Sequence, residues 1–274
     1  DADLPGVKYL REQVTEARGM PSKEALVRRL NFCQWTGAEN PWLSADVWKG
    51  AGRDFDWRQL RGRRAYAGLD LSSTTDLTAL VFMVEPVLDG EPWLLVPFAW
   101  LPEDGLQRKA DKDRVPYVQW QAMGYLETTP GRAVSKRSVL QRLSALCDFF
   151  EVVAVAYDRW RMEDLVAMAN DDGVTLPPMI AFGQGYKDMS PAVEHFEEML
   201  LNGRLVHPNH PVLNWCANNA VTTADDAGNR KPSKEKANGR IDAIVAAIMA
   251  AGIQSADVEK PLDLTDFINN PIFN

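Results

Sequence analysis

Tyr66-Ala-Gly-Leu-Asp-Leu-Ser-Ser-Thr-Thr-Asp-Leu-Thr-Ala-Leu-Val-Phe-Met-Val84 is the stretch that decides the expected fold, because its apolar runs predict two β-strands joined by a polar turn. Leu69 and Leu71 would point to one face of the first strand, so Asp70 would point to the other face. Burying an ionised carboxylate is costly unless it is paired or binds a metal ion. Asp70 is therefore a candidate functional residue. The alternative is an Asp near a strand end that reaches solvent or pairs with an arginine.

The segments that follow predict an α/β protein with a mixed β-sheet flanked by helices. A third strand, Trp93–Trp100, follows a tight turn, so the first three strands should be antiparallel. The apolar run Val152–Tyr157 predicts a central strand buried on both faces. Downstream, strands alternate with helices, as in an α/β fold. We expect helices over 138–150, 162–170, 190–201 (starting at Ser190-Pro191) and 239–251, strands over 179–182 and 204–207, a hairpin turn at 225–229, and a loop or lid over 102–117.

The chain is expected to have three parts. Residues 1–64 would form a lead-in arm that packs on a neighbouring unit, with helices over 6–18 and from Ser22. Residues 65–255 would form the main domain, and residues 256–274 a loose C-terminal tail.

Composition limits the kinds of partner. The formal net charge of -8 argues against binding a polyanion through global charge, so such contacts would need local basic patches or bridging metal ions. Two patches fit: Arg53–Arg64 has five Arg and two Asp, and Arg230–Arg240 has five basic residues and one Glu. Cys33, Cys147 and Cys216 are isolated among apolar residues, which is typical of reduced core thiols in a cytoplasmic protein. No apolar run approaches the length of a membrane span.

Two further carboxylates lie in positions comparable to that of Asp70. Asp158 directly follows the predicted buried strand, and ligands of open α/β sheets gather at the carboxyl ends of strands. Asp242 lies in the first turn of the last helix, on the shoulder of a core face formed by Ile241, Ile244, Val245 and Ile248, from where it could reach the sheet edge. Taken singly, Asp158 could cap a helix and Asp242 could interact with a helix dipole.

Together, the three Asp residues could converge on a hard cation. Carboxylates suit Mg²⁺ or Mn²⁺, and the absence of clustered His and Cys argues against Zn²⁺. Two such ions can activate a water and stabilise the leaving oxygen during phosphodiester cleavage.

Four motifs, in this order, resemble the nuclease domain of tailed-phage terminase large subunits. They are Gly-Leu-Asp-Leu-Ser-Ser…Asp-Leu-Thr-Ala from Gly68, Ala-Tyr-Asp-Arg-Trp from Ala156, His-Pro-Asn-His-Pro-Val-Leu-Asn-Trp-Cys-Ala-Asn-Asn-Ala from His207, and Lys-Pro-Ser-Lys…Arg-Ile-Asp-Ala-Ile-Val-Ala from Lys231. Leu30-Asn-Phe-Cys-Gln-Trp and Trp42-Leu-Ser also fit, so the resemblance extends from about residue 25 to 255.

The resemblance implies a ribonuclease-H-like fold and two-metal endonucleolytic cutting of concatemeric double-stranded DNA with little sequence specificity. It also implies that Asp70, Asp158 and Asp242 are the catalytic metal ligands. Full-length terminases carry an N-terminal packaging ATPase, whereas this sequence has no Gly-x-x-x-x-Gly-Lys-Ser/Thr loop, so the chain would be the nuclease part alone. The implied partners are DNA, that ATPase domain, the portal and the small terminase subunit, with no membrane. The implied location is the host cytoplasm during phage assembly, not the virion or a secreted state.

Several residues near these motifs have two interpretations. Asp76 could help to bind the second metal ion or could stabilise the turn between two strands. His207 and His210 could contact DNA or metal, but structural roles are more common for such residues. The basic residues just before Asp242 could touch the DNA backbone or form a solvated face; they are Lys231, Lys234, Lys236 and Arg240.

Two other functions stay open at this point. One is a ribonuclease-H-like docking module for the packaging motor that has lost its metal site. The other is a different polynucleotidyl transferase, such as a transposase or resolvase.

Overall fold

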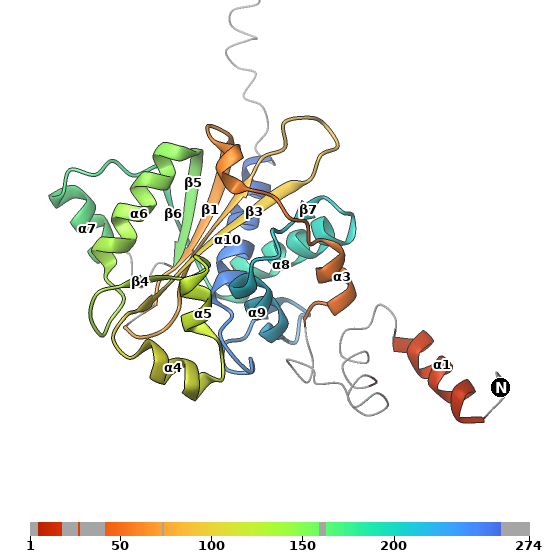
Figure 1. Cartoon of the computed structure of the whole chain (residues 1–274). Coiled ribbons are helices and arrows are strands. Elements are labelled where there is room, and N and C mark those ends of the chain that lie inside the picture. Colours follow the sequence, from red (N-terminus) through yellow and green to blue (C-terminus); the bar gives the residue numbers. More distant parts are fainter. Residues whose placement is uncertain (1–4, 18–26, 28–41, 73, 159–162, 259–274) are drawn as a thin grey trace, which may run out of the picture.

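The computed structural model of the chain describes residues 5–17, 27, 42–72, 74–158 and 163–258. Its centre is a seven-stranded mixed sheet with the order β4-β3-β2-β1-β5-β6, in which β7 also pairs with β3. As predicted, the first three strands form an antiparallel meander and the later strands are parallel additions (Figure 1). The strands are β1 (Arg64–Asp70), β2 (Thr78–Val84), β3 (Trp93–Pro102), β4 (Glu127–Thr129), β5 (Glu151–Asp158), β6 (Met179–Phe182) and β7 (Leu205–Val206).

Strand β5 lies between β1 and β6, so the predicted strand over 152–157 exists inside the sheet. Only its middle, residues 154–156, is buried, while its two ends are half-buried or exposed. The expectation of burial on both faces is therefore right for the middle of the strand and wrong for its ends. The half-buried end at Asp158 leaves this carboxylate partly accessible.

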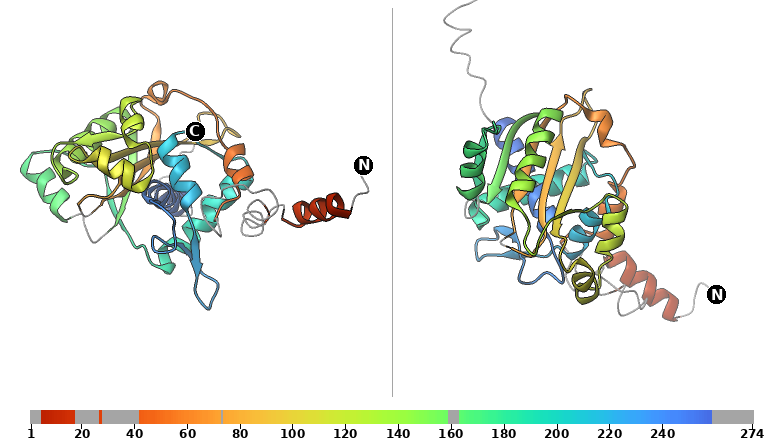
Figure 2. Two further views of the ribbon diagram at one scale, coloured as in Figure 1. Left: turned by 60° about the horizontal axis from the view of Figure 1, so that its bottom comes forward. Right: turned by 60° about the vertical axis from the view of Figure 1, so that its left-hand side comes forward.

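Two helical layers cover the sheet (Figures 1 and 2). One face packs on α6 (Lys136–Phe149) and α7 (Glu163–Asp171), and its core includes Leu69 and Leu71. The opposite face packs on α8 (Tyr186–Leu201), α9 (Pro211–Asn219) and α10 (Asp242–Val258). Asp70 points to this second face, because its neighbours in the strand point to the first. The alternation in the opening stretch of sequence thus predicted the correct side.

Helix α10 is more deeply buried than predicted. Residues 241–251 are all buried, because the helix lies between the sheet on one side and α8 and α9 on the other. A helix that is apolar on all sides belongs in such a position. The expected single core face was therefore too narrow a description, and the helix begins at Asp242 rather than at residue 239.

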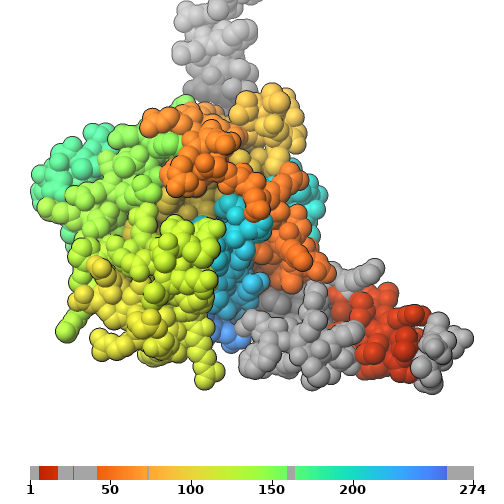
Figure 3. All heavy atoms as spheres, viewed as in Figure 1, coloured from red at the N-terminus to blue at the C-terminus, as the bar shows by residue number. Residues whose placement is uncertain are grey.

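Two local predictions were wrong, and one strand was not predicted. Residues 102–117 are not a plain loop, because they contain α4 (Leu106–Asp113), which buries Leu106 and Ala110 one turn apart and leads to α5 (Tyr117–Ala122). Helix α8 begins at Tyr186 instead of Ser190, so Pro191 lies inside the helix. The short strand β4 was not predicted. Figure 3 shows α4 and α5 (yellow-green) at one surface beside α9 (cyan).

The β3 edge of the sheet is paired at both ends and open between them. Strand β7 pairs with Trp93 and Leu94, and β4 pairs with residues 100–102. Residues 95–99 have no strand on that side among the described residues. Pro97, which has no N–H to donate, lies in this open stretch, as is usual for proline in edge strands.

The N-terminal part contributes to the same core as the sheet. Helix α1 (Pro5–Ala17) agrees with the predicted helix over 6–18 and stands apart from the sheet in Figure 2. Of the second predicted helix, from Ser22, the structure describes only Val27, which is helical and buried. Trp42 packs on Phe196 and Trp48 is buried, with α3 (Ala45–Gly50) and a 3₁₀ turn (Trp57–Leu60) leading to β1. The division of the chain at residue 64 stays a prediction.

Two smaller expectations concern the cysteines and the membrane. Cys216 is buried and Cys147 half-buried, both as free thiols, and Cys33 lies outside the described residues. Within the described ranges, no helix has the length and apolar character needed to cross a membrane.

Candidate active site

The sheet brings two of the predicted carboxylates to one edge. Strands β1 and β5 are parallel neighbours, with Leu69 opposite Tyr157. Asp70 and Asp158 are the last residues of these two strands. Because parallel neighbours end at the same edge of a sheet, both carboxylates lie there.

Helix α10 brings the third carboxylate to the same place. It runs along β1 in the opposite direction, because its last turn contacts the start of the strand: the Tyr66 hydroxyl donates to Asp257 Oδ2 at 2.6 Å. Its middle approaches Gly68 so closely that a Cβ added there would lie 1.9 Å from the Ala246 carbonyl oxygen. Gly68 thus permits the contact that places Asp242, the first residue of α10, beside Asp70.

The three predicted carboxylates line one pocket of about 370 Å³. The pocket is polar in character, and its wall combines the ends of β1 and β5, the turn after β1 and the segment before α10. The side chains that contribute to it include Asp70, Asp76, Asp158, Gln184, Lys234, Arg240 and Asp242.

Lys234 connects two of the carboxylates directly. Its Nζ donates to Asp70 Oδ2 at 2.6 Å and to Asp242 Oδ1 at 2.8 Å. The Asp70 and Asp242 side chains are 3% and 9% exposed, whereas the lysine side chain as a whole is 47% exposed. The lysine therefore reaches in from the surface and places its charged end between two buried carboxylates.

The carboxylates of the pocket and Lys234 shift each other's pKa values. Burial raises the pKa of Asp70 to about 6; the Lys234 ammonium opposes this rise, and the charges of Asp242 and Asp158 add to it. Burial alone would lower the pKa of Lys234, but the two carboxylates outweigh burial and raise it. The pocket therefore favours a cation at the position of this ammonium.

Asp76 lies at the rim in a separate ion-pair cluster. Arg240 Nη2 contacts Asp76 Oδ1 at 2.8 Å, and Lys109 Nζ lies 3.8 Å from the same oxygen. Asp113 of α4 lies 3.9 Å from both cations. Burial, followed by the charge of Arg240, lowers the pKa of Lys109. This cluster ties the turn after β1 to α4 and to the segment before α10, and a role for Asp76 in binding metal stays a prediction.

The four basic residues predicted to lie near DNA have different surroundings in the structure. Lys231 lies on the predicted hairpin of β8 (Thr222–Ala224) and β9 (Arg230–Pro232), with its ammonium 5.0 Å from the Tyr186 ring centre. Lys236 is exposed, whereas Lys234 and Arg240 contact carboxylates. Their roles in binding DNA stay predictions.

The two histidines lie away from the carboxylate pocket. His207 is buried, stacks on Trp48 at 4.1 Å, and pairs through Nε2 with the Trp48 carbonyl oxygen at 2.8 Å. His210 packs edge-on against Tyr125. These contacts support the structural interpretation of both residues.

Three residues of the site region were missed from the sequence. Gln184 donates to Asp70 Oδ1 at 3.4 Å, and Lys109 and Asp113 complete the rim cluster. Gln184 follows β6, so the rule that ligands gather at the carboxyl ends of strands could have found it. No comparable signal marks Lys109 or Asp113, because both lie in a charged run without an apolar period.

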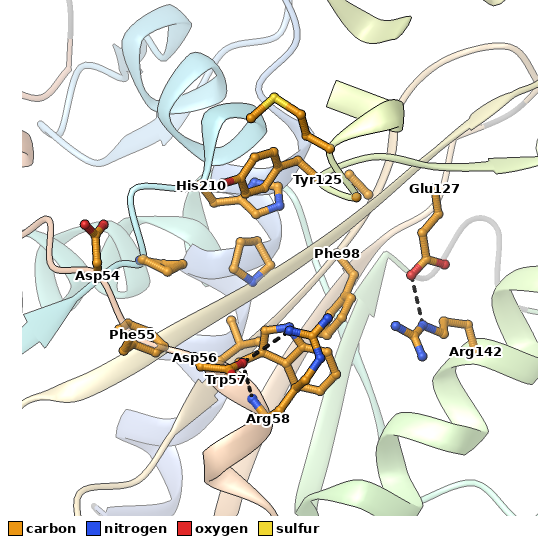
Figure 4. A pocket seen from close by; sticks show the side chains of 16 residues that line it. Asp54, Phe55, Asp56, Trp57, Arg58, Phe98, Tyr125, Glu127, Arg142 and His210 are labelled. Carbon is orange, nitrogen blue, oxygen red and sulfur yellow. Dashed lines mark hydrogen bonds and ion pairs between the residues drawn. The ribbon is translucent and has the colours of Figure 1, made fainter. Parts of the chain in front are cut away.

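A second pocket, of about 640 Å³, lies along the open stretch of β3 (Figure 4). Figure 4 shows aromatic side chains around it, with Tyr125 beside His210 and Trp57 beside Arg58. Four of its charged residues form two separate pairs, Asp56 with Arg58 at 3.3 Å and Glu127 with Arg142 at 3.0 Å, and Asp54 accepts from the Asn209 side chain at 3.0 Å. It lacks a convergence of carboxylates, so the 370 Å³ pocket is the better candidate for the active site.

The donor set of that pocket fits a hard divalent cation. In the described residues, no group of three or more His, Cys, Asp or Glu side chains is already arranged around a metal-sized position. Asp70 and Asp242 nevertheless converge on one cation, the Lys234 ammonium, and Asp158 lines the same pocket. Carboxylate oxygens are the ligands that Mg²⁺ and Mn²⁺ prefer.

This mixed sheet, with carboxylates at the ends of two neighbouring parallel strands and a third on the covering helix, is of the ribonuclease-H-like class. Comparison with known proteins gives the family. The sequence model described as "Terminase large subunit, endonuclease domain" matches residues 5–257, and the chain belongs to this family.

Similar proteins agree with this assignment. The chain is 41% identical over 266 residues to the terminase large subunit of Enterobacteria phage HK97, covering 97% of this chain and 52% of that protein. The crystal structure of the HK97 large terminase superposes with a TM-score of 0.72 over 90% of this chain and 50% of that chain. Protein YmfN of Escherichia coli (strain K12) is 26% identical over 245 residues, covering 86% of this chain and 53% of that protein. The chain thus spans about half the length of the curated relatives that it matches.

Proposed function

We propose that this chain is a metal-dependent DNA endonuclease that cuts concatemeric double-stranded DNA with little sequence specificity, by a two-metal-ion mechanism using Mg²⁺ or Mn²⁺. The observation that carries the proposal is the convergence of Asp70 and Asp242 on one cation in a pocket that Asp158 also lines. Membership of the terminase endonuclease family supports it.

In this proposal Asp70, Asp158 and Asp242 hold the ions. When bound, the ions would activate a water for attack on the phosphorus and stabilise the leaving oxygen. Asp70 is fixed by the strand that carries it, and Gln184 donates to the oxygen that does not contact Lys234. Asp242 is fixed by the first turn of a buried helix. The backbone thus holds two ligands rigidly before any ion binds, which lowers the cost of assembling the site.

The half-buried position of Asp158 suits a ligand that lies nearest the substrate. The carboxylate ends a strand whose final residues are partly accessible, whereas Asp70 and Asp242 are buried. DNA phosphate would therefore approach from the Asp158 side, and its charge would be balanced mainly by the bound ions because the chain is acidic overall.

Lys231, Lys236 and Arg240 are proposed as contacts to the DNA backbone. All three lie on β9 or on the segment that joins it to α10, close in sequence to Asp242. Backbone contacts from such side chains would set the position of the duplex without reading its sequence, which agrees with low specificity.

A docking module without catalytic activity is the second candidate. The observation in its favour is the ammonium of Lys234, which already pairs with Asp70 and Asp242 as a permanent structural cation would. A polynucleotidyl transferase of another family is not proposed, because the chain belongs to the terminase endonuclease family.

The proposed partners are the other components of a phage DNA-packaging complex. They are an N-terminal packaging ATPase domain, the portal and the small terminase subunit, acting in the host cytoplasm during phage assembly. The chain spans about half the length of its curated relatives, so activities of their remaining halves are not assigned to it.

A plasmid-cleavage assay separates the two candidates. The nuclease proposal predicts conversion of supercoiled plasmid to nicked, linear and then smeared products with Mn²⁺ or Mg²⁺, and no conversion with EDTA. Unchanged plasmid with either ion at high protein concentration would contradict it and favour the docking module.

A further inference from the structure

Two buried carboxylates share one ammonium at the centre of the candidate active site. Asp70 Oδ2 and Asp242 Oδ1 both lie within 2.8 Å of Lys234 Nζ. Carboxylates this close repel each other unless a cation lies between them, and the repulsion is strong where water is excluded. Lys234 is therefore the cation that offsets the repulsion between Asp70 and Asp242.

The lysine is attached in a way that allows it to leave. It lies on residues 233–241, which join β9 to α10 and form turns and bends rather than a strand or helix. Its side chain is 47% exposed and has a flexible four-carbon stem, so the ammonium can move into solvent without breaking regular structure.

The joining segment keeps other anchors when Lys234 is released. Ser233 N–H donates to the Val221 carbonyl oxygen at 2.8 Å, and Arg240 pairs with Asp76 at 2.8 Å. The Asn219 side chain also donates to the Arg240 carbonyl oxygen at 3.4 Å. Movement would therefore be confined to residues 234–239.

A divalent ion needs the same oxygen atoms as the ammonium. Mg²⁺ binds carboxylate oxygens at about 2.0–2.1 Å, closer than an ammonium approaches them. The ion also carries twice the charge, so it should win the competition for two ionised carboxylates. We propose that Lys234 is a built-in counter-cation of the active site, which holds Asp70 and Asp242 in place until a divalent ion displaces it and releases residues 234–239. This inference rests on the proposed nuclease function.

Calorimetric titration of Mn²⁺ at pH 8 tests the competition. Lys234→Met removes the competitor, so Mn²⁺ should bind about tenfold more tightly than to the unchanged protein, while the Tm in EDTA should fall. Lys234→Arg keeps a cation beside the two carboxylates and should therefore preserve the Tm in EDTA. This variant still tests the role of the cation if Lys234→Met fails to fold. Lys236→Met, an exposed lysine of the same segment, is the matched control for Mn²⁺ affinity and should leave it unchanged.

Amide hydrogen exchange measures the release itself. In the unchanged protein, saturating Mg²⁺ should speed exchange in residues 234–239, whereas in Lys234→Met exchange should be fast with or without Mg²⁺. Equal Mn²⁺ affinity of the unchanged protein and Lys234→Met, with no effect of Mg²⁺ on exchange, would overturn the inference and leave the nuclease proposal standing. Failure of both proteins to bind Mn²⁺ would overturn the nuclease proposal and the inference together.

Discussion

The two pockets of this domain compensate their charges in opposite ways. In the aromatic pocket of Figure 4, Asp56 and Glu127 each pair with their own arginine, and Asp54 accepts a hydrogen bond from the Asn209 side chain. In the carboxylate pocket, Asp70 and Asp242 share a single ammonium, and Asp158 adds a further negative charge. In the first pocket each carboxylate has a separate partner, whereas in the second pocket two carboxylates share one cation and gain by binding a further one.

This difference in charge indicates which of the two pockets is the candidate active site. A larger cavity with aromatic walls looks more like a ligand site by volume, about 640 Å³ against 370 Å³. Charge makes the smaller pocket the better candidate, because two buried carboxylates that share one ammonium are costly to maintain and are kept where they serve a function.

The largest expected effect on plasmid cleavage comes from neutralising Asp70 in the carboxylate pocket, compared with neutralising Glu127 in the aromatic pocket. Asp70→Asn removes a proposed metal ligand at nearly constant volume, so plasmid cleavage should fall by at least about a hundredfold. Glu127→Gln in the aromatic pocket is the matched control and should leave cleavage within about twofold. Initial cleavage rates in Mn²⁺ measure both, and a similar loss in the two variants would remove the distinction between the pockets.

The next effect concerns the close approach of α10 that forms the carboxylate pocket. In Gly68→Ala the added Cβ would meet the Ala246 carbonyl oxygen, so α10 must shift and stability should fall by about 3 kcal/mol. The expected fall in Tm is about 6 to 12 °C. Gly50→Ala is the control, since a Cβ there has nothing within 4 Å. Equal Tm values for the two variants would show that α10 is not fixed by this contact.

His210, which lines the aromatic pocket, should make the protein less stable as the pH falls. His210 is 9% exposed, and burial lowers its pKa to about 4. Because its pKa in the unfolded chain is about 6.5, the unfolded state binds more protons between these values, and stability falls as the pH falls. From pH 7 to 5 this histidine should contribute a loss of about 2 kcal/mol, which His210→Asn should remove, whereas the raised pKa of Asp70 acts in the opposite direction in both proteins.

Urea unfolding at the two pH values measures this loss, with His195→Asn as a control for removing a histidine. His195 lies on α8 and pairs with Gln254 at 2.8 Å, away from the aromatic pocket. If His210→Asn lost as much stability on acidification as the unchanged protein, the pH dependence would have another source.

The smallest effect is expected from basic residues outside both pockets. Lys231→Ala combined with Lys236→Ala should weaken DNA binding several-fold and reduce the salt slope of the affinity by up to about 2, one unit for each lost phosphate contact. Lys234 is left unchanged, because its ammonium contacts carboxylates. Binding isotherms at several salt concentrations measure the slope, and an unchanged slope would mean that these lysines form only a solvated face.

The sequence was informative wherever a local period determines position. The alternation of Leu69, Asp70 and Leu71 predicted the side of the sheet that Asp70 faces, and the apolar run after residue 151 placed Asp158 at a strand end. The antiparallel order of the first three strands followed from their short connections.

The sequence was less informative about residues whose role depends on distant contacts. The sequence places Lys234 among basic residues that could touch DNA or form a solvated face, and it gives no sign that Lys234 pairs with Asp70, 164 positions away. Helix α4 was missed since it buries only Leu106 and Ala110 within a charged run, too few apolar residues for a periodic pattern. Such features are set by tertiary packing rather than by local sequence.

Anomalous diffraction from crystals soaked in Mn²⁺ tests the central claim most directly, because it locates bound ions without relying on activity. The account predicts anomalous peaks in the 370 Å³ pocket, within ligand distance of Asp70, Asp158 and Asp242, with the Lys234 ammonium moved away from the two buried carboxylates. A fully soaked crystal without a peak in this pocket, and with Lys234 still bound to Asp70 and Asp242, would contradict the account.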